Sequence, residues 1–367
     1  MTAGTREIAI VGGGPAGAAA ACLLTKAGRS VLLFEREALP HHKVCGEFVS
    51  GEAATQLATL GLDLAGLGAL PIHSVRLIQG GTATTTRLPF PAFSLSRQVM
   101  DEALLQAAAG QGAEIRRGVA VRSLTEAADA VTLDADELVT AQTVLLASGK
   151  HDLRGHRRAP GAINDMIGFK RYLTLAPDRM AELAGHVEVF LFPGGYAGLQ
   201  PVSATEANLC LVVSKTVHAE VGKSWDDLLD HIAHHCRPFA DRLTGATSRW
   251  ERPLSIYGIP YGFVHRAPAP SRRLHRLGDQ LAVIPSFSGD GMAIALQSAF
   301  LAADRVLAGQ PALDGRRFAG QIRTATWLAR TIRQPVLQGI AAAACRLAPG
   351  LLKTVASATR VSDPVQP

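Results

Sequence analysis

The chain has 367 residues, 47% of them hydrophobic and 19% charged, which is the balance of an ordinary globular protein. Its net charge is +6, but the basic residues are scattered and form no run interleaved with aromatic residues, so the sequence disfavours a nucleic-acid-binding protein. Five widely spaced cysteines without a CxxC pair are typical of reduced thiols. Because neither a signal peptide nor a long apolar run is evident, we expect a cytoplasmic protein.

A dinucleotide-binding unit opens the chain. The β-branched run 8–11, the glycine turn 12–17 and the small-residue run 18–24 predict strand, turn and helix. A second strand over 30–34 places Glu35 eighteen residues after that turn, where its carboxylate can accept hydrogen bonds from the ribose of an adenosine. The turn lets a pyrophosphate approach the backbone, and the helix N-terminus offers it unpaired N–H groups.

The loop over 38–48 carries Cys45 and follows the ribose-binding strand, so it can fold back across a bound cofactor. Cys45 can shield the cofactor, line a substrate pocket or form an adduct, and it can equally be a small buried hydrophobe. His41 and His42 lie close to it, but no second pair of ligands follows. We therefore expect no metal site.

The next segments predict the start of an inserted sheet. A helical pattern over 50–60 is followed by strands at 73–79 and 83–88, which two glycines join into a hairpin. Ser96 is placed to cap a helix that ends near residue 109, and Arg97 is then at the N-terminal end of that helix.

Strands are then predicted over 113–122 and 130–140. The apolar run 143–147 closes on Ser148 and Gly149, which is typical of a central parallel strand whose carboxyl end faces a cofactor.

Residues 167–263 predict a mostly antiparallel sheet, interrupted by a helix over 224–235. Asp227, His231 and His235 fall on one stripe of this helix, a spacing that can bind a metal ion but more often marks a solvated face.

The chain then returns to the first domain through Gly278 and Asp279 and a glycine turn over 285–292, followed by a long helix to about residue 307. Gly289 and Gly291 free the backbone at that helix N-terminus, where N–H groups can face an anion.

Further helices are predicted up to Pro335 and over 336–360. Basic residues beside their apolar stripe can rest on a membrane, guide a lipid-like substrate or pack against the protein itself. These residues are Arg316, Arg317, Arg323, Arg330 and Arg333.

Three motifs occur in a fixed order: the opening glycine turn with Glu35, Ser96-Arg97-x-x-x-Asp101, and Gly278-Asp279 with the turn over 285–292. Together they resemble the FAD-dependent superfamily that includes p-hydroxybenzoate-hydroxylase-type monooxygenases, flavin halogenases and geranylgeranyl reductases. The resemblance covers residues 6–310.

The resemblance implies an α/β fold with a Rossmann-type FAD-binding domain (GR2-like), an inserted and mostly antiparallel β-sheet substrate domain, and C-terminal helices. The implied boundaries are 1–72, 96–165 and 270–315 for the discontinuous FAD-binding domain, 73–95 and 166–269 for the substrate-binding domain, and 316–367 for the C-terminal helical segment.

It also implies the residues that bind FAD, with Arg97 near the diphosphate and ribose and Asp279 on the ribityl or pyrophosphate portion. The implied set is Gly12, Gly14, Pro15, Ala16, Gly17, Glu35, Arg36, Lys43, Cys45, Gly46, Arg97, Ser148, Gly149, Gly278, Asp279, Gly289, Asp290, Gly291 and Met292.

Other motifs bear on the branch of the superfamily. Lys43-x-Cys45-Gly46 and the turn 194–198 are similar to the geranylgeranyl reductase group, whereas aromatic hydroxylases usually have His where Ala282 stands. The hydroxylases' middle Asp-Gly motif is replaced by 148–154, which argues against direct, hydroxylase-style NADPH handling. Halogenases are disfavoured because the three tryptophans are isolated and form no Trp-x-Trp pair.

We therefore expect an FAD-dependent oxidoreductase of secondary metabolism that acts on a hydrophobic or aromatic small molecule, with NAD(P)H as electron donor. Hydroxylation through a C4a-hydroperoxide is the first expectation, a double-bond reductase or dehydrogenase of the geranylgeranyl reductase type is the alternative, and a non-catalytic flavin-binding protein is the second alternative. The expected catalytic residues are Cys45, Tyr196 and Pro285, and the expected substrate-binding residues are Phe192, Tyr196, Gln200 and Phe287.

Overall fold

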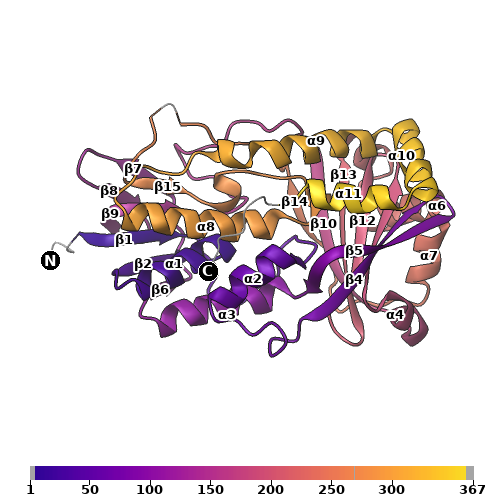
Figure 1. Ribbon diagram of the computed structural model, residues 1–367, viewed down its shortest axis with the longest axis horizontal. Coiled ribbons are helices and arrows are strands. Elements are labelled where there is room, and N and C mark those ends of the chain that lie inside the picture. Colours follow the sequence, from indigo (N-terminus) through magenta and orange to yellow (C-terminus); the bar gives the residue numbers. More distant parts are fainter. Residues whose placement is uncertain (1–4, 268, 361–367) are drawn as a thin grey trace.

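Two β-sheets lie end to end along the longest axis of the molecule, and helices cover their outer faces (Figure 1). The structure is a computed structural model and describes residues 5–267 and 269–360. The first sheet has seven strands, and the second has eight. The helices that contain the sequence motifs pack against the first sheet.

The seven-stranded sheet is built around the opening strand of the chain. Its strands are β1 (Arg6–Val11), β2 (Val31–Glu35), β6 (Glu114–Arg117), β7 (Ser123–Glu126), β8 (Val131–Asp134), β9 (Leu138–Leu146) and β15 (Leu274–Arg276). They follow the order β6-β2-β1-β9-β8-β7, with β15 paired to β9. β1 pairs in parallel with β2 and β9, so the carboxyl ends of these three strands meet at one edge, as the apolar runs predict.

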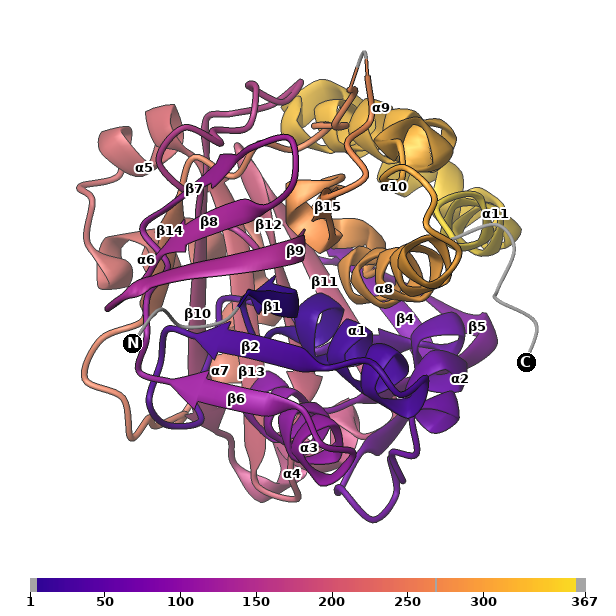
Figure 2. The same cartoon turned by 90° about the vertical axis from the view of Figure 1, so that its left-hand side faces the viewer.

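Four helices position the motifs against this sheet: α1 (Pro15–Lys26), α2 (Gly51–Thr59), α3 (Arg97–Gly110) and α8 (Gly291–Leu307). One continuous core joins α1, α3 and α8 to the inner residues of β1 and β2, and Figure 2 shows α1 and α8 side by side against the strands. The alanine-rich surface of α1 allows this close packing, because its side chains are fully buried yet small.

Two predicted strands differ from those observed. The strand expected over 113–122 is only β6, which Gly118 ends with a left-handed φ of 74°. The strand expected over 130–140 is a hairpin of β8 and β9, because the polar residues 134–137 turn the chain between them.

The eight-stranded sheet follows the order β14-β10-β13-β12-β11-β4-β5-β3. Its strands are β3 (Phe48–Ser50), β4 (Leu70–Gln79), β5 (Thr82–Ser94), β10 (Met166–Thr174), β11 (His186–Phe192), β12 (Gly195–Pro201), β13 (Glu206–Ser214) and β14 (Leu254–Tyr257). All neighbours are antiparallel except β4 and β11, so the predicted mostly antiparallel sheet that includes the early hairpin is confirmed. That hairpin is longer than predicted and contains an irregularity between Ile72 and Ser74.

Four helices lie beside the eight-stranded sheet: α4 (Pro177–Leu183), α5 (Lys215–Glu220), α6 (Trp225–His235) and α7 (Arg237–Leu243). Leu228 and Ile232 of α6 and Phe239 of α7 pack into a core with the strands. This sheet is therefore covered by helices on one face, which leaves its other face toward the rest of the molecule.

The chain ends in α9 (Ala319–Arg333), α10 (Pro335–Leu347) and α11 (Gly350–Ala358), which lie along one side of the molecule (Figures 1 and 2). Proline stands at the start of α10 and just before α11, where a backbone N–H would have no hydrogen-bond partner within the helix and its absence costs nothing. In the part of the chain that the structure describes, no single helix is long and apolar enough to cross a membrane. The α10–α11 pair, bent by 117°, passes that test only when the two are taken together.

Candidate cofactor and substrate site

The opening glycine turn brings the start of α1 directly onto the end of β1. A Cβ on Gly17 would lie 1.9 Å from the carbonyl oxygen of Gly12, and a Cβ on Gly12 would lie 2.5 Å from the carbonyl oxygen of Ala147. Only glycine fits these approaches, because any side chain would push the helix from the sheet. The unpaired N–H groups of α1 therefore stand over the strand ends.

Two cations stand at the same helix end. The space beside Gly14 is bounded by Arg97 Nη2 and Lys43 Nζ, each 3.8 Å from the position of an added Cβ. Asp101 binds both cations, at 2.8 Å from Arg97 Nε and 3.0 Å from Lys43 Nζ. The three side chains carry a net charge of +1, which adds to the positive end of the helix dipole.

These charges are maintained despite burial. Burial lowers the pKa of the Arg97 guanidinium, but Asp101 and Cys45 outweigh it and raise that pKa above its ordinary value. Burial likewise raises the pKa of Asp101, but Arg97 and Lys43 outweigh it and lower that pKa. The open backbone at Gly14 and two permanent cations suit a diphosphate.

Glu35 lies buried at the end of β2. Its Oε2 accepts a hydrogen bond from the N–H of Gly13 at 2.8 Å and its Oε1 from the N–H of Glu37 at 3.0 Å. A carboxylate has roughly four lone-pair directions, so this residue retains the capacity to accept from ribose hydroxyls. Its neighbour Arg36 is exposed and pairs with Glu37 instead.

The Gly278–Asp279 motif lies beside the opening glycine turn. A Cβ on Gly278 would lie 3.3 Å from the Cβ of Ala16, so the short helix η1 (Gly278–Gln280) stands against the start of α1. Gln280 donates to the carbonyl of Gly149 at 2.9 Å, which brings the loop after β9 to the same place. Segments from three distant parts of the chain therefore meet at this point.

The second helix N-terminus, that of α8, follows the turn η2 (Ser286–Ser288). Gly289 adopts a left-handed φ of 72°, and a Cβ there would lie 2.8 Å from the ring of Phe48. The glycine turn thus packs against the chain just after the Cys45 loop, and the start of α8 has open space, since nothing lies within 4 Å of an added Cβ at Gly291.

Side chains of the eight-stranded sheet hold the Cys45 loop in place. Asn208 Nδ2 on β13 lies 3.0 Å from the carbonyl oxygens of both Cys45 and Gly46. Lys150, in the loop after β9 of the other sheet, also donates through Nζ to the carbonyl of Val44 at 3.0 Å. The loop that we expect beside the cofactor is therefore fixed to β13 of the eight-stranded sheet and to the loop after β9.

A buried ion pair completes this attachment. Glu47 and Lys170 have side chains that are 1% exposed or less, and Oε1 of Glu47 lies 2.5 Å from Lys170 Nζ. The hydroxyl of Tyr172 donates to Oε2 at 2.7 Å. Glu47 also has a left-handed φ of 62°, rare for a residue with a side chain, so these bonds hold a strained backbone.

Glu47 further replaces the helix cap predicted for Ser96. Ser96 occupies the N-cap position of α3, but its side chain makes no capping hydrogen bond. The N–H of Arg97 donates to Glu47 Oε1 at 2.8 Å instead, so the carboxylate caps the helix. Sequence analysis missed this role, although a lysine inside the apolar strand at residues 167–173 is the signal of a buried partner.

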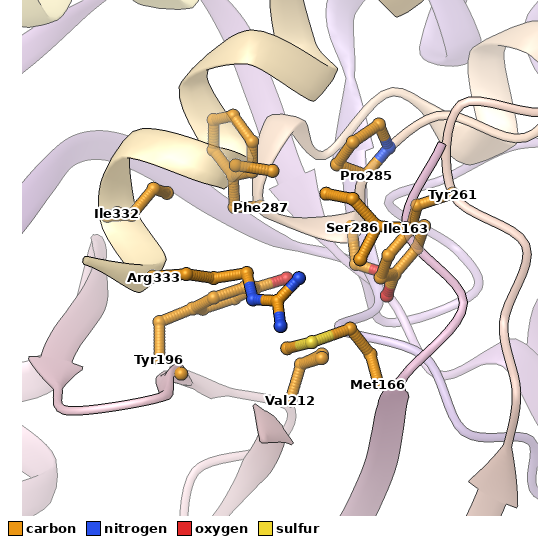
Figure 3. Close-up of a pocket in the computed structure, with 12 residues that line it drawn as sticks. Ile163, Met166, Tyr196, Val212, Tyr261, Pro285, Ser286, Phe287, Ile332 and Arg333 are labelled. Atoms are coloured by element: carbon orange, nitrogen blue, oxygen red, sulfur yellow. The ribbon is translucent and has the colours of Figure 1, made fainter. Parts of the chain in front are cut away.

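A pocket lies where the glycine turn, the eight-stranded sheet and α9 meet (Figure 3). About 330 Å³ at this place is not filled by atoms, a volume that includes open solvent, and the lining is mainly apolar. Ten of its side chains are labelled in Figure 3: Ile163, Met166, Tyr196, Val212, Tyr261, Pro285, Ser286, Phe287, Ile332 and Arg333. The expected site residues Tyr196, Pro285 and Phe287 are thus brought together.

Phe192 and Gln200, two of the expected substrate-binding residues, do not line this pocket. Phe192 is fully buried on the helix-covered face of the sheet, where its ring meets His231 edge-on. Gln200 is buried and donates to Ser94 Oγ at 2.6 Å. Successive side chains of a strand alternate between faces, and the side chain of Phe192 falls on the face away from the pocket.

Phenolic hydroxyls supply the polar edge of the pocket. Tyr261 Oη lies 2.5 Å from Ser286 Oγ, beside Pro285. Burial raises the pKa of Tyr196 and of Tyr261, so both phenols keep their protons at neutral pH. Arg333 is paired with Asp165 at 2.5 Å.

The end of the C-terminal helices reaches back to the glycine turn. Arg360 Nη1 lies 2.8 Å from Asp290 Oδ1, and its Nη2 donates to the carbonyl of Ser288. Its guanidinium also lies over the ring of Phe90. This contact was not predictable from the sequence, because Arg360 lies 70 residues from Asp290.

The comparisons with known proteins agree with this geometry. Residues 5–144 match the family described as FAD binding domain. Over these residues and in its named relatives, the chain is similar to the FAD-dependent monooxygenase-like superfamily. It is a flavin-dependent oxidoreductase, as expected from the three motifs.

Two named relatives are reductases. The chain is 25% identical to a menaquinone reductase of Mycolicibacterium smegmatis over 83% of its own length and 76% of the relative. It is 30% identical to digeranylgeranylglycerophospholipid reductase 2 of Methanopyrus kandleri over 56% of its length and 54% of that protein.

Solved structures with the same fold include two halogenases. The flavin-dependent brominase Bmp2 superposes with a TM-score of 0.79 at 20% identity, covering 97% of this chain and 93% of that one. The halogenase PltM in complex with phloroglucinol and FAD superposes with a TM-score of 0.71 at 16% identity, covering 90% and 76%. At these identities the likeness concerns the fold alone.

Proposed function

We propose that the protein is an FAD-dependent reductase that acts on a carbon–carbon double bond of an isoprenoid chain. The observation that carries this proposal is the apolar pocket at the late glycine turn, whose walls are aliphatic and aromatic side chains. Menaquinone and digeranylgeranylglycerol phospholipid, the compounds in the relatives' names, both carry isoprenoid chains, and an uncharged polyene chain suits such walls.

We propose that FAD lies between the opening glycine turn and the glycine turn over 285–292. Gly14, Lys43 and Arg97 hold the diphosphate, and Glu35 accepts from the adenosine ribose. The remaining expected residues, apart from the exposed Arg36, line the path between the two glycine turns. We propose residues 1–72, 96–165 and 270–315 for this part, 73–95 and 166–269 for the substrate part, and 316–367 for the C-terminal helical segment. Of these ranges, residues 1–4, 268 and 361–367 lie outside the described residues. Cys45 and Pro285 stand at the junction of the first two parts.

Reduced FAD supplies a hydride when it is bound. The chain's own residues then exclude water and hold a proton. Tyr261 and Ser286 share one hydrogen bond at the pocket edge, and the raised pKa of the phenol keeps a proton at Oη. Donation of that proton to the substrate carbon opposite the hydride completes the addition of two hydrogens across the double bond. NAD(P)H is the proposed source of the electrons.

Hydroxylation stays the second candidate. The pocket that suits an isoprenoid chain also suits a hydrophobic aromatic ring, and the superfamily includes monooxygenases. Halogenation is disfavoured despite the fold likeness, because Trp225, Trp250 and Trp327 stand alone in the sequence.

Product mass distinguishes these reactions. The purified protein is reduced anaerobically with NADPH or dithionite and mixed with a prenylated quinone or a geranylgeranyl lipid. A product that keeps two extra hydrogens in its isoprenoid chain after any quinone ring has been reoxidised in air, with reoxidation of the flavin, supports the reductase. A product heavier by one oxygen atom, formed only in air, replaces it with hydroxylation. The absence of any substrate-dependent flavin oxidation contradicts both reactions.

A paired variant tests the proton donor. Tyr261→Phe removes the hydroxyl but keeps the ring, so flavin reduction by dithionite is expected to be unchanged while reoxidation by substrate slows by roughly 10²- to 10⁴-fold. Tyr257→Phe is the control, since that side chain is exposed on β14. Equal rates in both variants would refute the role of Tyr261.

A further inference from the structure

The C-terminal helices combine positive charge with exposed apolar side chains. Residues 315–360 contain no Asp or Glu and eight basic side chains: Arg316, Arg317, Arg323, Arg330, Arg333, Arg346, Lys353 and Arg360. Contacts already described hold Arg333 and Arg360 against carboxylates. Arg323, Arg330, Arg346 and Lys353 form no ion pair with another of the described residues.

The apolar side chains lie among these four cations. On α9, Trp327 is 65% exposed and follows Arg323 by one turn, with Arg330 about one turn further on. On α10, Val336, Ile340 and Leu347 are 75%, 61% and 85% exposed and fall on one face of the helix. After the bend, α11 has the exposed Leu351 two residues before the exposed Lys353.

We propose that α9, α10 and α11 dock the protein on an anionic lipid surface. A helix that lies in a membrane interface buries an apolar face and points Lys and Arg toward lipid phosphates, and Trp is enriched at that depth. All three features occur here on consecutive helices of one side of the molecule. This inference goes beyond the proposed reaction and holds for any substrate.

A second copy of the chain fits this surface less well. An isologous contact would place a segment with no carboxylate against itself, so cation would face cation across the interface. An anionic lipid surface supplies the missing negative charge and also accepts the apolar side chains. Charge complementarity therefore selects the lipid as the occupant.

Vesicle flotation tests the proposal with the intact, FAD-loaded protein. We expect binding to vesicles of equal parts phosphatidylcholine and phosphatidylglycerol, much weaker binding to phosphatidylcholine alone, and release at high salt. The fluorescence of Trp327 should shift to the blue on binding, and Trp327→Phe should remove that part of the signal. Absence of binding, or equal binding to neutral vesicles that salt does not release, overturns the proposal.

Two matched pairs of variants locate the surface. Arg346→Gln with Lys353→Gln should weaken binding roughly thirtyfold, while Arg122→Gln with Arg249→Gln, which are exposed elsewhere, should leave it unchanged. Leu347→Ser should weaken binding, and Leu138→Ser, at an equally exposed site on β9, should not. Equal loss in a variant and its control contradicts the assignment to α10 and α11.

Two further measurements distinguish other occupants. Sedimentation of the wild type as a stable dimer that Leu347→Ser dissociates would assign the surface to a second copy. Resistance of vesicle-bound protein to alkaline carbonate would assign α10 and α11 to insertion across the lipid. The flavin absorbance and anaerobic substrate assay are run on the same variants, so failure of docking is distinguishable from failure of the proposed reaction.

Discussion

Lys170→Met is the sharpest test of the attachment between the two sheets. The substitution keeps an unbranched side chain that is one heavy atom shorter, but it leaves the Glu47 carboxylate buried without its cation, since both side chains are essentially unexposed. Breaking one partner of a buried pair costs about 3–5 kcal/mol. Because Tyr172 and the N–H of Arg97 still donate to that carboxylate, we expect the lower end of this range, about 3 kcal/mol.

The measurement is urea unfolding of FAD-saturated protein, followed by the shift in the midpoint. Arg249→Met is the control, since Arg249 is 78% exposed and its pair with Glu206 should be worth less than about 1 kcal/mol. Adding Glu47→Gln to Lys170→Met removes the unpaired charge and should recover part of the loss. A loss for Lys170→Met no larger than that for Arg249→Met would refute the reasoning.

Three further predictions concern the cofactor site. Gly17→Ala should yield protein without FAD, read from the flavin absorbance, because its Cβ would lie 1.9 Å from the Gly12 carbonyl oxygen. Arg97→Gln should weaken FAD binding roughly ten- to hundredfold in a titration, since it loses a charge-assisted bond to the diphosphate. Because the pKa of Asp101 is lower in the folded protein than in the unfolded chain, its ionised carboxylate stabilises the fold at any pH above the ordinary carboxyl pKa. This stability is lost as the pH falls from that ordinary value to the lower pKa of the folded protein. Asp101→Asn should remove that part of the pH dependence of stability.

Each of these has a control. Gly110→Ala, with nothing within 4 Å of its Cβ, should keep its FAD, and Arg122→Gln should bind FAD normally. Asp136→Asn, at an exposed position, should leave the acid unfolding curve unchanged. If Gly17→Ala retains FAD, or if Arg97→Gln binds FAD with normal affinity, the proposed diphosphate site is contradicted. If Asp101→Asn unfolds in acid along the same curve as the wild type, the ion-pair argument is contradicted.

The motifs that sequence analysis placed correctly are local. The opening strand, turn and helix were predictable because the approach of Gly17 to Gly12 involves only neighbouring residues and glycine stereochemistry. The start of α8 was predictable in the same way, from the glycines at 289 and 291. Their meeting was predictable only through the resemblance to a known superfamily.

Long-range partners were not predictable. Glu47 and Lys170 are 123 residues apart, and the sequence around each residue does not identify the other as its partner. The face on which Phe192 lies was not predictable for a related reason. Leu191 and Phe192 are both buried, since both faces of the strand are covered, so the sequence pattern does not identify the face toward the pocket.

The helix α9 connects the two proposals made here. Its inner face contributes Ala329, Ile332 and Arg333 to the pocket, and Trp327 is exposed on a different face. A helix with its side chains is about 10–12 Å across, so a lipid surface against the outer face would lie only one helix from the pocket. An isoprenoid chain dissolved in that lipid then has a short apolar path to the site, which a substrate with such low solubility in water requires.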